Sequence, residues 1–117
     1  MKLVRFGERG KEKPGVIDAS GAIRDVSSIV PDFSPETLSP GLIELLGRAD
    51  LSALPATPEG VRIGAPLSRI GHFIAIGLNY ADHAAETGAA IPAEPIVFSK
   101  APSSLSGPDD DVLLPRG

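Results

Sequence analysis

Two residues in one short segment, His83 and Glu86, have the side chains and the spacing that proton transfer requires. They lie three positions apart, so they would share one face of a helix. An imidazole beside a carboxylate can give or take a proton near neutral pH. The same spacing also occurs in exposed helical ion pairs, which stabilise a helix by only about 0.2–0.5 kcal/mol. The pair alone leaves both interpretations open, and the other ionisable groups are predicted to be ordinary surface residues.

The segment that carries this pair follows an apolar run over residues 73–77. A short apolar run bounded by Gly and polar residues is typical of a buried strand. Asp82 is predicted to cap the helix that holds His83 and Glu86, and Gly88 is predicted to end it. A strand would therefore deliver the pair to a loop or a short helix.

Short elements are predicted for the rest of the chain, because 13 Gly and 12 Pro among 117 residues favour turns. Ser39 is predicted to cap a short helix that Gly47 ends. A β-hairpin is predicted with Gly21 at its turn. The expected strands, including the two of that hairpin, cover residues 2–6, 15–18, 23–26, 61–63, 73–77, 96–99 and 112–114.

Composition excludes several classes of function. The formal net charge is −4, which does not favour binding to nucleic acid or to an anionic membrane. Cysteine is absent, so disulfides, thiol catalysis and cysteine-ligated zinc are excluded. No apolar run approaches the length of a membrane span. We therefore expect a soluble cytoplasmic protein whose core consists mainly of Val, Ile, Leu and Ala.

Several other polar residues are interpreted as structural. The charged loop over 7–13 is predicted to be solvated surface. The acidic run at 109–111 lacks the spaced ligands and the glycine of a calcium loop, so a turn before a strand is predicted there. Ser103 and Ser104 have no nearby base in the sequence, which argues against a nucleophile. His72, at the entrance of a predicted strand, is assigned to the surface.

Three motifs in the second half of the chain occur together in a highly specific order and spacing. They are IGLNYADHAAE at 76–86, EPIVFSKAPSSLSGP at 94–108 and LPRG at 114–117. Together they resemble the opening of the catalytic domain of the fumarylacetoacetate hydrolase family. The first 65 or so residues resemble, less specifically, the small N-terminal domain of bacterial members labelled ureidoglycolate lyase or 2-hydroxyhepta-2,4-diene-1,7-dioate isomerase.

This resemblance implies an α+β fold that is mostly β. A small N-terminal domain of hairpin and helix would cover residues 1–66, and the first strands of the catalytic domain would cover 67–117. It also implies a homodimeric enzyme that acts on 2-oxo acids or related compounds. The reactions of the family include C–C hydrolysis, decarboxylation, isomerisation and lyase steps. A divalent metal, usually Mg or Mn, would chelate the oxo and carboxylate oxygens of the substrate and stabilise the developing enolate.

The resemblance also assigns roles to residues of this chain. His83 and Glu86 match a His-x-x-Glu pair that lies on a mobile lid of the family and orients water or moves a proton. Lys100 matches a lysine that is common in the family, where it would contact substrate; a solvated strand end is the other interpretation.

The chain departs from the family pattern at the metal site. The metal ligands of the family, two Glu of a Glu-x-Glu strand and a later Asp, lie downstream of the position that matches Gly117. Glu44, Glu59 and the acidic run at 109–111 do not match that motif. We therefore expect the N-terminal part of a family member, as a fragment, a cleaved product or one of two segments, which binds no metal and does not catalyse alone. Its partner would be the missing C-terminal segment or a second subunit.

A noncatalytic β-rich binding or assembly module is the alternative. The two hypotheses differ in a simple observation. A reading frame that continues into the Glu-x-Glu strand supports the enzyme, and one that ends at Gly117 favours the module.

Overall fold

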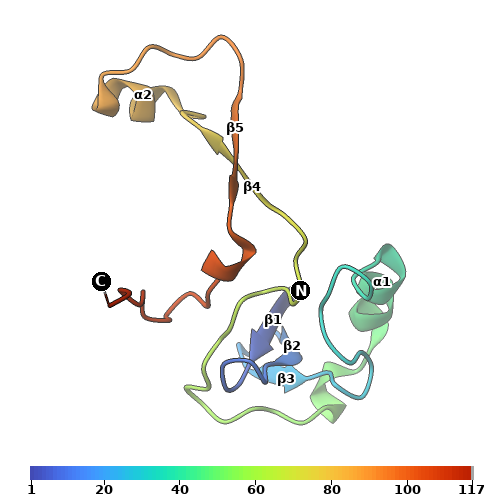
Figure 1. Cartoon of the computed structure of the whole chain (residues 1–117). Helices are drawn as coiled ribbons and strands as arrows, with labels where there is room; N and C mark the ends of the chain where they lie inside the picture. The colour runs from blue at the N-terminus through green and yellow to red at the C-terminus, as the bar shows by residue number, and fades with distance from the viewer. Residues whose placement is uncertain (117) are drawn as a thin grey trace. The chain divides into compact units, whose positions relative to one another are not determined.

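The computed structural model describes residues 1–116, which form two compact units of short strands and helices (Figure 1). One unit contains Met1–Ile70 together with the segment from Ser106 onward, and the other contains Gly71–Leu105. Gly117, the last residue of the LPRG motif, lies outside the described residues. The elements in chain order are β1 (Lys2–Phe6), β2 (Lys13–Ile17), β3 (Ile23–Asp25), α1 (Pro40–Arg48), the 3₁₀ turn η1 (Leu51–Ala53), β4 (Phe73–Gly77), α2 (Ala81–Thr87), β5 (Ile96–Lys100) and the 3₁₀ turn η2 (Pro102–Ser104).

The first unit is built on the antiparallel sheet β1-β2-β3. Val16 of β2 pairs with Leu3 of β1 on one side and with Arg24 of β3 on the other. The β2–β3 turn contains Gly21 at φ +88°, a conformation that other residues rarely adopt. The Asp18 carboxylate accepts the N–H groups of two turn residues and closes the turn. The predicted hairpin and its glycine turn are therefore confirmed.

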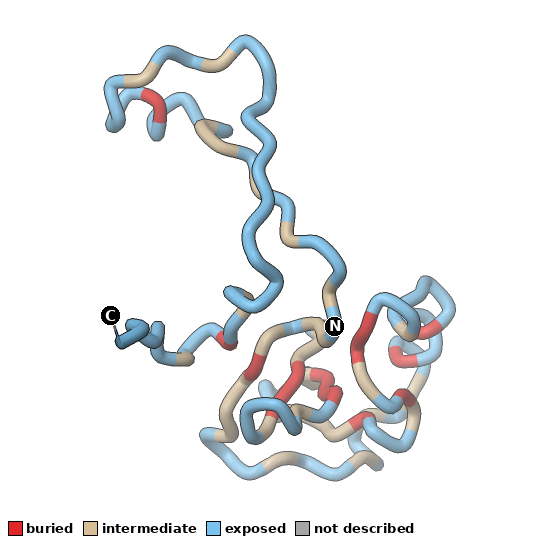
Figure 2. The backbone as a smooth tube through the Cα atoms, viewed as in Figure 1, coloured by how far each residue is buried: buried red, intermediate tan, exposed pale blue. Residues whose placement is uncertain are grey.

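The core of this unit is formed by β2, the segment after β3 and the helix α1, and its buried stretches are red in Figure 2. Ser39 caps α1 as predicted, because its hydroxyl accepts the N–H of Leu42 at 3.2 Å. Leu42 and Leu46, four residues apart, share the buried face of the helix. The helix continues to Arg48, one residue beyond the predicted end at Gly47. The buried core residues are Val16, Val26, Val30, Phe33, Leu42 and Leu46.

A partly buried ion pair ties the segment after Ser106 to the rest of the first unit. The guanidinium of Arg62 donates to both carboxylate oxygens of Asp110, at 2.6 and 2.7 Å, and to Glu12 at 2.9 Å. The side chain of Glu12 is only 9% exposed. The prediction that the charges of loop 7–13 are solvated surface is therefore wrong at Glu12, because two arginines hold that carboxylate inside the unit.

Two predicted strands of this unit do not form. Residues 112–114 make no strand, and Val112 and Leu114 are each 88% exposed. An apolar run becomes a strand only when a neighbouring strand accepts its hydrogen bonds, and none of the described residues does so here. Residues 61–63 contribute a single bridge, between Ile63 and Phe6.

The second unit contains the antiparallel pair β4–β5, with α2 between the two strands in sequence. Both strands occur where they were predicted, but they are not buried. Ile74 and Ile76 of β4 are 56% and 43% exposed, and every residue of β5 is exposed. The reason is that a sheet of only two strands leaves most of its surface open to solvent within the described residues.

Candidate functional site

The helix α2 carries the predicted acid–base pair and begins directly after Tyr80. Tyr80 occupies the N-cap position and makes no side-chain capping bond. Asp82 lies in the first turn, where its carboxylate accepts the backbone N–H of His83 at 2.8 Å. The prediction of Asp82 as the cap is therefore wrong, although a carboxylate in the first turn still favours the helix electrostatically. Gly88 ends the helix at φ +65°, which confirms the predicted C-cap.

His83 and Glu86 both lie exposed on α2. Among residues 1–116, neither side chain donates or accepts a hydrogen bond to another side chain, and the two form no ion pair with each other. Only Ala84 of this helix is buried. The imidazole and the carboxylate are therefore both free to meet a ligand, and their three-residue spacing places them on one face. Their role as a catalytic pair stays a prediction.

Lys100, the predicted substrate contact, lies at the end of β5. Its Nζ atom is 6.0 Å from the ring centroids of both Phe73 and Phe98. Phe73 is its partner in the strand register. These distances are at the outer limit of a cation–π contact. The lysine is exposed, so its ammonium can also reach an anion in solvent.

The residues that the sequence assigned to structural roles do not join His83 and Glu86 in the part of the chain described. His72 is exposed just before β4. Ser104 belongs to η2, and its hydroxyl donates to the carbonyl of Ala101 at 2.8 Å. Asp110 is the exception among the acidic residues at 109–111, because it pairs with Arg62.

Sequence reasoning missed the electrostatic network around Arg62 and Arg5. Hydrogen bonds from Arg62 lower the pKa of Asp110 from 3.8 to about 2. Burial raises the pKa of Asp32, but hydrogen bonds, first among them those from Arg5 at 2.7 and 3.1 Å, outweigh burial and leave the pKa lowered. These pairs are 48 and 27 residues apart in sequence, so no local motif signals them.

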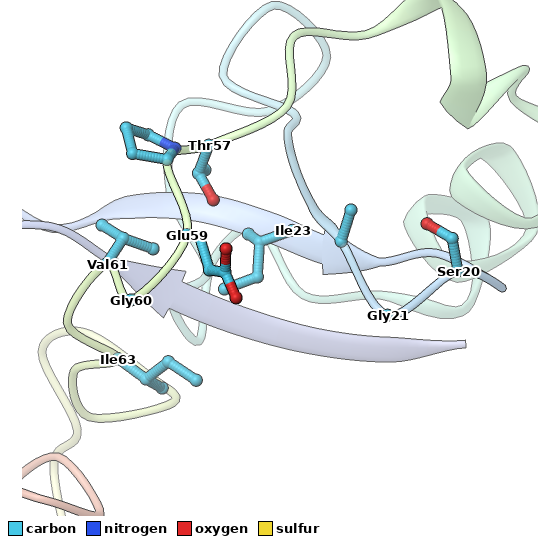
Figure 3. A pocket seen from close by; sticks show the side chains of 10 residues that line it. Ser20, Gly21, Ile23, Thr57, Glu59, Gly60, Val61 and Ile63 are labelled. Atoms are coloured by element: carbon cyan, nitrogen blue, oxygen red, sulfur yellow. The ribbon is translucent and has the colours of Figure 1, made fainter.

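Open hollows lie in both units of the described structure. Figure 3 shows the hollow of about 520 Å³ between the β2–β3 turn, with Ser20, and the segment that carries Glu59 and Val61. A smaller hollow of about 240 Å³ lies in the second unit, between the end of β4 and residues 91–95. Glu59 makes no ion pair within residues 1–116, so the hollow beside the β2–β3 turn has a free carboxylate on an otherwise mainly apolar lining.

The described residues do not form a metal centre. No group of three or more His, Asp or Glu side chains among residues 1–116 is placed to hold a metal ion. Hard cations such as Mg²⁺ require several oxygen ligands at fixed positions. This chain's own residues therefore do not fit the metal that the family resemblance implies, and no chemical step is assigned to a metal bound by them.

Comparison with known proteins gives a family for the second half of the chain and relatives for its whole length. Residues 72–117 match the family model described as Fumarylacetoacetate (FAA) hydrolase C-terminal. Over all 117 residues the chain is 50% identical to provisionally named hydrolases of Burkholderia ambifaria and Burkholderia multivorans. A crystal structure of a provisionally named HpcE protein from Mycobacterium smegmatis aligns with the whole chain at a TM-score of 0.71 and 27% identity. The second half of the chain, residues 72–117, therefore matches the fumarylacetoacetate hydrolase family.

The family match and the structural alignment confirm the resemblance and the predicted α+β, mostly β fold. The chain spans 42% of the length of the Burkholderia relatives and 42% of the solved Mycobacterium chain. No helix in the described part of the chain is long and apolar enough to cross a membrane.

Proposed function

We propose that the protein containing this chain is a metal-dependent enzyme that acts on 2-oxo acids or related compounds, with His83 and Glu86 as its acid–base pair. The reaction is a C–C hydrolysis, a decarboxylation, an isomerisation or a lyase step. One observation carries the proposal: α2, inside the family-matching region, has both side chains exposed and free of side-chain partners among residues 1–116.

The chemistry of the pair follows from its side chains. The His83 imidazole changes charge near neutral pH, so it can accept a proton from substrate or water and return it. The Glu86 carboxylate either orients the imidazole or shares a water molecule with it. A positioned acid–base group of this kind contributes about 10²–10⁴-fold to a rate. Water must be held beside the pair during hydrolysis and kept away during isomerisation, so the closure of α2 over substrate would decide between these outcomes.

A divalent cation, Mg or Mn, would polarise the oxo and carboxylate oxygens of the substrate when bound. The described residues supply no ligand set for it, so its ligands are proposed to lie in polypeptide outside this chain. Lys100 is proposed to contact the anionic end of the substrate, because it is exposed and carries a positive charge at the end of β5. A homodimeric assembly and a cytoplasmic location belong to the same proposal.

The proposal is tested by direct product analysis. The native protein that contains this sequence is incubated with Mg²⁺ and a panel of 2-oxo acids, with oxaloacetate, 2-oxoglutarate and 2-oxoadipate as probes, and products are identified by mass spectrometry. We expect conversion of at least one compound, and loss of that conversion when EDTA removes the metal. Conversion that is unaffected by EDTA, or no conversion of any 2-oxo acid, would contradict the proposal.

A further inference from the structure

Leu78, which joins β4 to α2, has a backbone conformation that is unusual for its residue type. Its φ angle is +46°, in the left-handed region that non-glycine residues seldom adopt. Arg69 is the only other non-glycine residue of the described chain with a positive φ. The preceding residue, Gly77, has no positive φ, so the residue free to adopt this conformation is not the one that adopts it.

The side chain of Leu78 occupies a position that glycine, which has no side chain, would leave empty. It is partly buried and lines the hollow of about 240 Å³ at the base of α2. On one side of that hollow it lies with Ile76 and Asn79, and on the other side lies the returning segment 91–95. Leu78 therefore contributes an apolar side chain to the hollow between the strand end and the segment that leads into β5.

We propose that Leu78 is a positioning residue that fixes the direction in which α2 leaves β4, and thereby the placement of His83 and Glu86. The inference rests on the proposed function. Strained backbone conformations persist only where the surrounding structure determines them, and they are found most often at active sites and switch regions. A single left-handed residue turns the chain sharply between strand and helix. Glycine would adopt this conformation with less strain but without a side chain, so the apolar side chain in the hollow is what holds Leu78 in the turn.

The conformation and the side chain contribute separately, so a substitution series can distinguish them. Leu78→Gly removes the backbone strain together with the apolar anchor. Leu78→Asn keeps the left-handed conformation, which asparagine tolerates, but removes the anchor. Leu78→Ile keeps an apolar side chain, but its branched Cβ disfavours the left-handed region. Leu78→Met keeps an unbranched apolar side chain and serves as the conservative control.

The experiment measures turnover and helix protection in the native protein that contains this sequence. We expect kcat of Leu78→Gly to fall by about 10–100-fold with KM within about twofold, because misplaced catalytic groups lose rate more than binding. Amide hydrogen exchange should be faster in α2, including the N–H groups of Ala84 and Ala89, which bond to Tyr80 and Ala84. Leu78→Met should match the wild type in both measurements, and Leu78→Asn should fall between Leu78→Gly and Leu78→Met.

The two readouts separate failure of this inference from failure of the proposed function. Wild-type protection of α2 and wild-type kcat in Leu78→Gly would overturn the inference, even if His83→Ala is inactive. If His83→Ala keeps full turnover, the proposed function fails. The positioning role is then lost with it, whatever the exchange rates of α2 show. Leu78→Gly relieves backbone strain, so this variant should fold and can be measured even if Leu78→Ile does not fold.

Discussion

Gly107→Ala is expected to destabilise the first unit, because an added methyl group has no space there. A Cβ atom at this position would lie 2.3 Å from the carbonyl oxygen of Ile63 and 3.1 Å from the Cα of Gly64. Nonbonded atoms prefer separations of about 3.5–4.0 Å, so the turn after Ser106 would have to retreat by roughly 1 Å. That displacement would stretch the bonds of 2.6 and 2.7 Å between Arg62 and Asp110.

The expected loss is about 1–3 kcal/mol in the free energy of unfolding, the range for a forced fit in a well-packed site. Gly47→Ala is a matched control, since the same methyl group there meets no atom within 4 Å. Gly47 lies in α1, where replacing glycine with alanine stabilises a helix by about 0.5–1 kcal/mol. The same substitution should therefore have opposite signs at the two positions.

Urea unfolding followed by circular dichroism measures both variants against the wild type. The chain has no Trp, and its one Tyr lies in the second unit, so the peptide signal is the better probe of the first unit. A Gly107→Ala midpoint equal to or above that of the wild type would show that residues 106–110 do not pack against Ile63 and Gly64. An unchanged m-value would confirm that only stability, and not the extent of unfolding, has changed.

Two further predictions concern acid and the β4–β5 pair. The pKa of Asp110 lies near 2, below its usual 3.8, mainly because of the hydrogen bonds from Arg62. Its contribution to stability is therefore present above pH 3.8 and lost as the pH falls toward 2, so Asp110→Asn should lose less stability than the wild type across that interval, while Asp109→Asn should lose as much. Equal acid sensitivity of Asp110→Asn and the wild type would refute this. In the isolated chain, amide exchange should be faster in β4 and β5 than in β2, because their apolar side chains are exposed and the pair has only two strands. Strong protection of β4 and β5 in a monomer would contradict it.

Local signals in the sequence predicted most elements of the fold. The hairpin turn at Gly21 and the caps at Ser39 and Gly88 depend on residues within a few positions of each other. These features can therefore be recognised in the sequence without knowledge of the tertiary structure. The apolar run at 112–114 has the same local pattern as the strands that form, but it forms no strand in the structure. A strand depends on a distant partner, and an apolar run does not reveal whether one exists.

The site was predictable in part. The sequence placed His83 and Glu86 on one short helix, and the structure has that helix. The left-handed conformation of Leu78 had no signal, because a leucine beside a glycine predicts that the glycine takes the unusual φ angle. The Arg62–Asp110 pair was also hidden, because its partners are 48 residues apart and each looks like surface charge in its own segment.

The most direct test of the account is the turnover of His83→Ala and Glu86→Gln in the native protein that contains this chain. We expect kcat to fall by about 10²–10⁴-fold in each variant, because each removes one member of the acid–base pair. Mg²⁺ affinity, measured separately by calorimetry, should be unchanged, since the metal ligands are proposed to lie elsewhere. Glu44→Gln, an exposed charge change on α1, should match the wild type. Turnover near that of the wild type in both variants would contradict the acid–base pair, and loss of Mg²⁺ binding in both would instead assign the two residues to metal coordination.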